Sequence, residues 1–318
     1  MSARVGPTWR GPCLQLQWRP ERCGCSTGTR RETDMRGLPA IISACANANL
    51  RDFVPLHIDG TMAGRVHHRR APYLLKCLPW LQQGADVLLW NGDDPAGRTR
   101  RLAEALPVLA EAGLARAPTG ELFDVVRPFG GIPLARCDRA LLPTFGFPGY
   151  GVHVVGYVAD AGGPLIWIPR RSHDREIAPG QLDNTIAGGI ASGMTVIETL
   201  RKEAQEEAGL PPPVVDAAQP TGGLAYCHQE GEFLRDDTLF LYDLPMHRDV
   251  RPCNLDGEVE DFSLMPWRQV LELLRNGASF KFNCGPVLID FLLRHGLMDP
   301  DREPGYSGLA RGLRGSAL

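Results

Sequence analysis

Three glutamates at helical spacing, Glu203, Glu206 and Glu207, are the residues whose types and positions could do chemistry. At positions i, i+3 and i+4 their carboxylates lie near one another on one side of a helix, where like charges cost roughly a few tenths of a kcal/mol per pair. A solvated acidic surface tolerates that cost. A hard divalent cation held through oxygen ligands would remove it. Mg²⁺ suits such a site because it is held by a few carboxylates together with substrate phosphates, and Mn²⁺ is the alternative ion.

The residues around the glutamates predict the helix that carries them. Thr195 and Glu198 form a capping box, in which each side chain satisfies a backbone N–H at the start of the helix. Gly209 suits the residue that ends the helix, and the prolines at 211–213 block its continuation. We therefore expect a helix over residues 195–208.

One face of this helix should pack on a sheet, and the glutamates should lie beside that face. The residues expected on the packing face are Ile197, Leu200, Ala204 and Ala208. Gly188 and Gly189 precede the helix and allow the backbone to bend sharply and approach a ligand closely. A surface helix has no need of such a pair, so the glycines favour a metal site over an acidic surface.

This run resembles the Nudix box, G-x5-E-x7-R-E-U-x-E-E-x-G-U, where U is a bulky aliphatic residue. The matching positions are Gly188, Glu203, Glu206, Glu207, Gly209 and Leu210. The sequence departs from the box at Met194 in place of the first glutamate, Lys202 in place of arginine, and the small Ala204 in the aliphatic position. Lysine keeps the charge of arginine but loses its forked geometry. These departures bear on rate and metal affinity more than on metal binding itself.

Four flanking segments resemble one branch of the Nudix family. They are residues 145–157, 182–184, 256–260 and 280–284. The branch carries a characteristic N-terminal domain and includes the Nudix portion fused to fungal thiamine pyrophosphokinase, with plant relatives. The resemblance spans residues 36–314 and implies hydrolysis of thiamine diphosphate, or of its oxidised analogues, to the monophosphate.

The implied mechanism assigns a role to each candidate site residue. Glu203, Glu206 and Glu207 hold metal ions that bridge the diphosphate and activate water, with Lys202 in the arginine position. Glu258, or one of the three carboxylates, is the candidate general base. The candidates for substrate binding are Arg170, Arg171, Gly188, Gly189, Lys281 and Tyr150.

Aromatic and histidine residues near residue 150 have competing interpretations. Tyr150 and Phe147 could stack on a heteroaromatic ring of the substrate or fasten two domains together. His153 lies within a strand-like alternation, which favours a hydrogen-bonded core histidine.

The hydrophobic patterning predicts an α/β protein with a mixed sheet between helices, preceded by a small α+β domain. The resemblance implies that the second part is a Nudix α/β/α sandwich. The expected divisions are a disordered tail or over-called start (1–35), the N-terminal domain (36–141), a Pro/Gly-rich hinge (142–150), the Nudix domain (151–300) and a C-terminal tail (301–318).

The amino-acid composition limits the classes of molecule that this protein could bind. A formal net charge of −3 argues against a nucleic-acid or membrane-surface binder, and no apolar stretch has membrane-spanning length.

Nine cysteines without C-x-x-C spacing favour free thiols in a reducing, cytoplasmic compartment. Residues 1–34 lack the apolar core of a secretory signal, and their acidic residues count against a transit peptide. The expected partner is a small diphosphate, and a homodimer stays open.

Two alternative functions stay open beside the thiamine diphosphate hypothesis. One is hydrolysis of a nucleotide-type diphosphate such as ADP-ribose or a dinucleotide, because the box alone does not select a substrate. The other is a catalytically weak ligand sensor, which Met194 and Lys202 keep in consideration.

Overall fold

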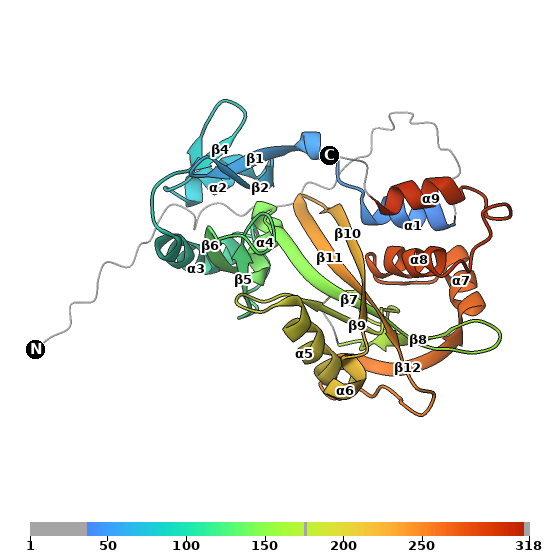
Figure 1. Cartoon of the computed structure of the whole chain (residues 1–318). Helices are drawn as coiled ribbons and strands as arrows, with labels where there is room; N and C mark the ends of the chain where they lie inside the picture. The colour runs from blue at the N-terminus through green and yellow to red at the C-terminus, as the bar shows by residue number, and fades with distance from the viewer. Residues whose placement is uncertain (1–36, 175–176, 315–318) are drawn as a thin grey trace, which may run out of the picture. The chain divides into compact units, whose positions relative to one another are not determined.

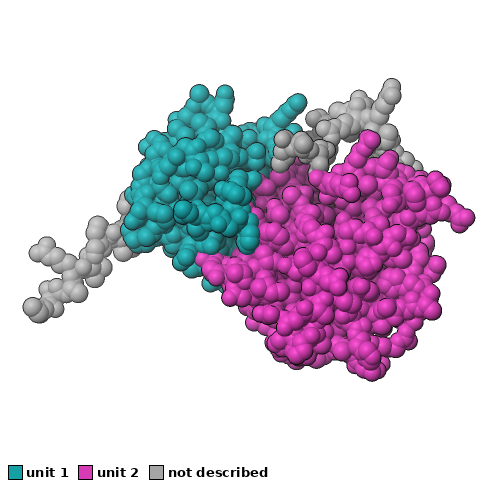
Figure 2. Space-filling model, in the orientation of Figure 1, with its two compact units in different colours: residues 1–27, 49–148, 230–234 teal, residues 28–48, 149–229, 235–318 magenta. Residues whose placement is uncertain are grey.

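The computed structural model describes residues 37–174 and 177–314 (Figure 1). These residues divide into two compact units, coloured separately in Figure 2. Unit 1 contains described residues 49–148 and 230–234, and unit 2 contains the others. The segment 1–35, predicted to be a tail and weighed as a transit peptide, lies outside the described residues.

Unit 1 is a small α+β unit built on a mixed sheet of order β2-β1-β4-β3 and a separate β5–β6 pair. Its elements are η2 (Leu50–Asp52), β1 (Phe53–Ile58), β2 (Thr61–His67), α2 (Ala71–Cys77), β3 (Gln82–Gln83), β4 (Leu88–Trp90), α3 (Pro95–Glu111), β5 (Leu122–Val125), β6 (Ala135–Asp138), η3 (Arg139–Leu141) and α4 (Leu142–Phe145). β1 pairs antiparallel with β2 and parallel with β4. The unit has a core of its own, centred on the fully buried Trp90.

Unit 2 contains a sheet of order β10-β11-β7-β8-β12, and β9 also pairs with β7. Its elements are α1 (Leu38–Cys45), β7 (Pro148–Val158), β8 (Leu165–Arg171), β9 (Ile186–Gly189), α5 (Val196–Ala208), α6 (Pro212–Val215), β10 (Gln219–Glu230), β11 (Phe233–Pro245), β12 (Val259–Pro266), α7 (Trp267–Arg275), α8 (Cys284–Arg294) and α9 (Tyr306–Leu313). β7 pairs antiparallel with both β8 and β9, so one long strand holds β8 and the glycines of β9.

Helices cover both faces of this sheet, as the predicted sandwich requires (Figure 1). Alternate residues of β7 point to opposite faces. Val152 and Val154 join the core under α5 and α6. Val155 joins the core shared with α1, α7, α8 and α9. The sheet therefore has one face covered by α5 and α6 and another covered by α1, α7, α8 and α9.

The predicted caps of α5 are confirmed. Thr195 accepts a hydrogen bond from the Glu198 backbone, and the Glu198 carboxylate accepts one from the Thr195 backbone at 2.8 Å. Gly209 ends the helix at a φ of 60°, a left-handed conformation that favours glycine. Leu200, Ala204 and Ala208 are fully buried, as expected.

The predicted packing face of α5 is wrong at one position. Ile197 is 38% exposed, whereas Val196 packs against the core and Glu207 is buried. The buried arc of the helix is therefore turned toward the side that carries the glutamates. Periodicity identified the face but did not fix its centre, because that depends on which strand the helix crosses.

Several boundaries differ from those expected. Helix α1 belongs to unit 2, where it packs against α8 and α9, rather than to the N-terminal domain. The expected hinge, residues 142–150, contains α4 and the beginning of β7, and its residues are mostly buried in apolar packing. Within the expected C-terminal tail, Tyr306–Leu313 form helix α9, whose Leu309 is fully buried.

The expectation of free thiols is also wrong at one position. Five described cysteines are free, but Cys77 is disulfide-bonded. Linear spacing does not show which thiols the fold brings together.

Candidate catalytic helix and buried acid cluster

Glu207 is the most deeply placed of the three glutamates, at 7% exposed. Its carboxylate accepts a hydrogen bond from the Ala187 backbone N–H of β9 at 3.0 Å. Burial raises the pKa of this carboxyl well above its ordinary value, and the charges of Asp183 and Glu203 raise it further. A surface acid has no such environment, so the solvated-surface interpretation does not hold for Glu207.

Glu203 lies against the first glycine of the box. A Cβ at Gly188 would lie 2.2 Å from the Glu203 Cγ and 2.6 Å from its Oε1. Glycine therefore lets this carboxylate rest directly on the backbone of β9. The side chain is 15% exposed. Burial raises the pKa of the carboxyl, and the charge of Glu258 is among the contributions that raise it.

Glu206 is paired with the lysine that precedes the glutamates in the box. Its Oε2 accepts a hydrogen bond from the Lys202 ammonium at 2.7 Å, and the same ammonium lies 3.2 Å from Glu203 Oε1. Partial burial lowers the pKa of Lys202, but these two carboxylates raise it by more. Lys202 thus occupies the arginine position of the box and holds one carboxylate, although without the forked geometry of a guanidinium.

The chemistry of these donors fits a hard divalent cation. Within residues 37–174 and 177–314, no three histidine, cysteine or acidic side chains stand close enough to hold a metal as they are. Mg²⁺ does not require a closed protein cage, because it binds one or two carboxylates, waters and substrate phosphates. Glu203 and Glu207 repel each other when both are ionised. A bound cation would remove this repulsion.

A buried carboxylate that had no assigned role lies next to this helix. Asp183 is 5% exposed and pairs with Arg171 at 2.8 Å and with Lys281 at 3.4 Å. Burial raises its pKa, but the charges of Lys281 and Arg171 lower it by more, to about 2. Asp183 is therefore ionised at neutral pH. Its signal in the sequence was its place in the segment 182–184, one of the four that resemble the Nudix branch.

His153 is a hydrogen-bonded core histidine, as expected. It is 3% exposed, and its Nδ1 lies 2.7 Å from Asn184 Oδ1, so that nitrogen donates to the amide oxygen. Burial, together with the charge of Lys281, lowers its pKa to about 4. The ring is therefore neutral at neutral pH and gives no proton to a substrate.

The two candidate arginines after the β8 core have different environments. Arg171 is buried and bound to Asp183 and to the Ile177 carbonyl, which argues against direct contact with phosphate. Arg170 points to the opposite side of the strand, donates to the Gly180 carbonyl and is 46% exposed. Arg170 and Lys281 stay candidates for substrate contact.

The remaining candidates are dispersed. Glu258 acts electrostatically on Glu203 from the loop before β12, which agrees with its nomination as a base. Gly189 pairs with Gly151, and the Tyr150 carbonyl accepts from Ile190. Phe147 is 1% exposed and stacks on Phe145 within the unit 1 core, so it cannot stack on a substrate ring.

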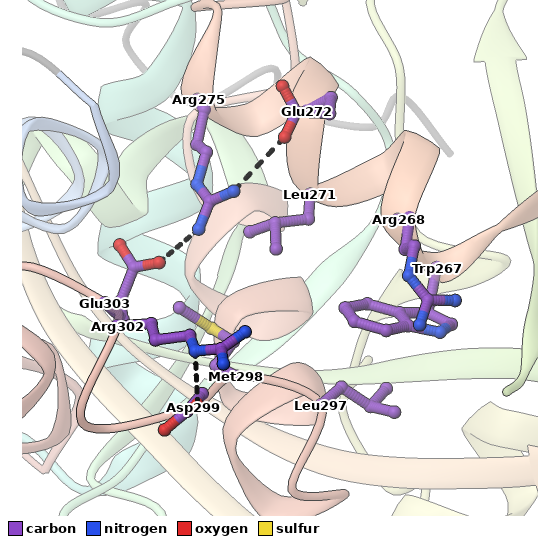
Figure 3. Close-up of a pocket in the computed structure, with 10 residues that line it drawn as sticks. All are labelled: Trp267, Arg268, Leu271, Glu272, Arg275, Leu297, Met298, Asp299, Arg302 and Glu303. Atoms are coloured by element: carbon purple, nitrogen blue, oxygen red, sulfur yellow. Dashed lines mark hydrogen bonds and ion pairs between the residues drawn. The ribbon is translucent and has the colours of Figure 1, made fainter.

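A pocket of about 380 Å³ lies on the other side of unit 2, at α7 and the segment after α8 (Figure 3). Its floor is apolar, with Trp267, Leu271 and Met298. Its cations already have partners: Arg275 binds Glu272 and Glu303, and Arg302 binds Asp299. No residue of α5 lines it, so this pocket is separate from the acid cluster.

Among the described residues, no helix is both long and apolar enough to cross a membrane. The NUDIX domain model matches residues 149–284. The chain is 36% identical to Nudix hydrolase 24, chloroplastic, of Arabidopsis thaliana, over 90% of this chain and 80% of the relative. It is 35% identical to Nudix hydrolase 20, chloroplastic, of the same plant, over 89% and 79%.

Part of the chain also resembles solved structures. The Nudix domain of Shewanella oneidensis NrtR complexed with ADP ribose aligns with a TM-score of 0.36 and 14% identity, over 47% of this chain and 88% of that one. The match of the domain model and the near full-length similarity to the plant proteins extend the box resemblance to most of the sequence. The chain belongs to the Nudix hydrolase family and is an enzyme that hydrolyses a diphosphate-containing substrate.

Proposed function

We propose that this enzyme converts thiamine diphosphate, or its oxidised analogues, to the monophosphate with Mg²⁺ as its metal. The observation that carries the proposal is the set of flanking segments that resemble the thiamine-associated branch. Two of them are joined through the contact between Asp183 and Lys281, and the segment 256–260 contributes Glu258, whose charge acts on Glu203. The branch-specific segments thus border the box helix, where a substrate would be selected.

In this proposal Glu203, Glu206 and Glu207 hold the metal, which supplies Lewis-acid polarisation of the diphosphate and a more acidic water. Glu206 must leave Lys202 to do so, a change of side-chain rotamer on an exposed helix face. Lys281 offsets negative charge that develops on the leaving phosphate. Glu258 accepts the proton of the attacking water.

The decisive experiment offers purified full-length protein three substrates with and without Mg²⁺: thiamine diphosphate, an oxidised analogue and ADP-ribose. We expect metal-dependent formation of a thiamine monophosphate. Turnover of ADP-ribose alone would overturn the thiamine assignment and favour the nucleotide alternative. Binding without any turnover would favour the sensor, for which Met194 and Lys202 are the sequence features.

A second experiment tests the metal ligands. Removing the charge of Glu207 by Glu207→Gln should lower kcat by about 100-fold or more, since the position contributes to charge stabilisation in the transition state. Glu272→Gln is the matched control, because Glu272 is an exposed glutamate on α7, across the sheet. Full activity of the Glu207 variant would remove it from the metal site.

A further inference from the structure

The segment 181–184 is an irregular stretch fixed between two other parts of unit 2. On one side the Asp183 N–H donates to the Pro169 carbonyl of β8 at 3.0 Å. On the other side Leu182 exchanges backbone hydrogen bonds with Ser279 and Lys281, both at 2.9 Å. The position of Asp183 is thus set by the backbone on both sides, before its side chain makes any contact.

The Asp183 carboxylate collects four donors from three segments. Its Oδ2 accepts from Arg171 at 2.8 Å and lies 3.4 Å from the Lys281 ammonium. Its Oδ1 accepts from the Asn184 N–H at 2.8 Å and from the Cys284 thiol at 2.6 Å. A buried carboxylate requires such compensation, because its ionised form is otherwise very costly in the interior.

The two cations bound to Asp183 are not equivalent. The Arg171 side chain is 8% exposed and also donates to the Ile177 carbonyl, so the buried charge is balanced inside the protein. The Lys281 side chain is 16% exposed and uses one of its three N–H donors on Asp183. Lys281 therefore keeps donors that can reach a ligand.

We propose that Asp183 is a positioning residue of the hydrolytic site. It binds the Lys281 ammonium so that the remaining N–H donors of that ammonium are available to the diphosphate. The inference rests on the proposed function in one respect, the assignment of Lys281 to the phosphate. It does not depend on which diphosphate is the substrate.

A double-mutant cycle tests the proposal. Asp183→Asn keeps the shape of the side chain and removes its charge, and Lys281→Met removes the ammonium. We expect each change to lower kcat/KM by about 100-fold, since small misplacements of a positioned group cost this much. We expect the double variant to lose no more than either single variant.

Asp243→Asn is the matched control. Asp243 is another buried carboxylate of unit 2, and it binds Arg294 through both oxygens at 2.8 and 2.9 Å, away from α5. The control should lower thermal stability while changing kcat/KM by less than about threefold. If Asp183→Asn alone does not fold, the double variant Asp183→Asn/Arg171→Gln removes both members of the buried ion pair. The effect of Lys281→Met on kcat/KM is then measured in that double variant.

The outcomes separate this proposal from the function on which it rests. Losses that multiply in the double variant, or an Asp183→Asn variant with lower stability but unchanged kcat/KM, would overturn the positioning role. The cycle is measured on whichever of thiamine diphosphate and ADP-ribose the wild-type enzyme hydrolyses, so a wrong thiamine assignment leaves it intact. Full activity of Glu207→Gln would instead indicate that the metal assignment failed.

Discussion

Gly188→Ala should disable the enzyme without unfolding it. Gly188 lies in β9 and is not among the glycines with positive φ, so alanine is compatible with its backbone. The added Cβ would meet the Glu203 Cγ at 2.2 Å and its Cδ at 2.3 Å. All three nearest atoms belong to one flexible side chain, so Glu203 moves and the strand stays.

The size of the effect follows from that distance. Ordinary contact for a Cβ begins at 3.4 Å, so the Glu203 side chain must retreat by at least the difference from 2.2 Å, which is 1.2 Å. A displacement of about 1 Å at a catalytic group costs about 100-fold in rate. That corresponds to about 2.7 kcal/mol of transition-state stabilisation. The cost to folding should be about 1 kcal/mol, the lower end for added methyl groups in packed sites.

The assay compares kcat/KM and its Mg²⁺ dependence with the thermal midpoint, for Gly188→Ala, Glu203→Gln and the double variant. Because both changes act on one carboxylate, the double variant should be no slower than Glu203→Gln. Gly308→Ala is the control, since its Cβ would meet nothing within 4 Å. If Gly188→Ala kept wild-type kcat/KM, Glu203 would not be needed where the structure has it, and the reasoning would be refuted.

Two further predictions concern stability. Thr195→Ala removes the capping box and should lower the free energy of unfolding by about 1 kcal/mol, measured by urea denaturation; an unchanged midpoint would mean that the cap contributes nothing. Asp183 has a folded pKa of about 2, below its ordinary value of 3.8, so its stabilisation is complete at neutral pH and is lost as pH falls from about 4 to 2. The loss should be roughly 2 kcal/mol and should be absent in Asp183→Asn, which acid titration of the unfolding free energy can measure.

Local signals were sufficient for the helix that carries the chemistry. The capping box, the glycine at residue 209 and the apolar spacing all act within one turn, so the sequence predicts them reliably. The hairpin of β1 and β2 and the strands β7 and β8 follow from the same kind of local pattern. The place of α1 in unit 2 does not, because it depends on packing against α9, which lies more than 250 residues later in the chain.

The site residues that belong to a family motif could be predicted from the sequence. The residues whose role depends on burial in the folded protein could not. The box named Glu203, Glu206 and Glu207, but it could not show that Lys202 pairs with both Glu203 and Glu206 while Glu207 is buried. Arg171 was a candidate for phosphate contact because its positive charge could offset charge that develops on the diphosphate. Its guanidinium is instead balanced by Asp183, a partner 12 residues away that no local pattern connects to it.

The different environments of the three glutamates argue for function more strongly than their spacing does. If α5 were an ordinary surface helix, the lowest-energy rotation would bury Ile197 and expose every carboxylate. The structure has the reverse at both positions: Ile197 is 38% exposed and Glu207 is 7% exposed. Burying an acid in place of an isoleucine costs folding free energy. Binding of a cation offsets that cost. The buried carboxylate charge of Glu207, which is unfavourable without a cation, then serves as a metal ligand.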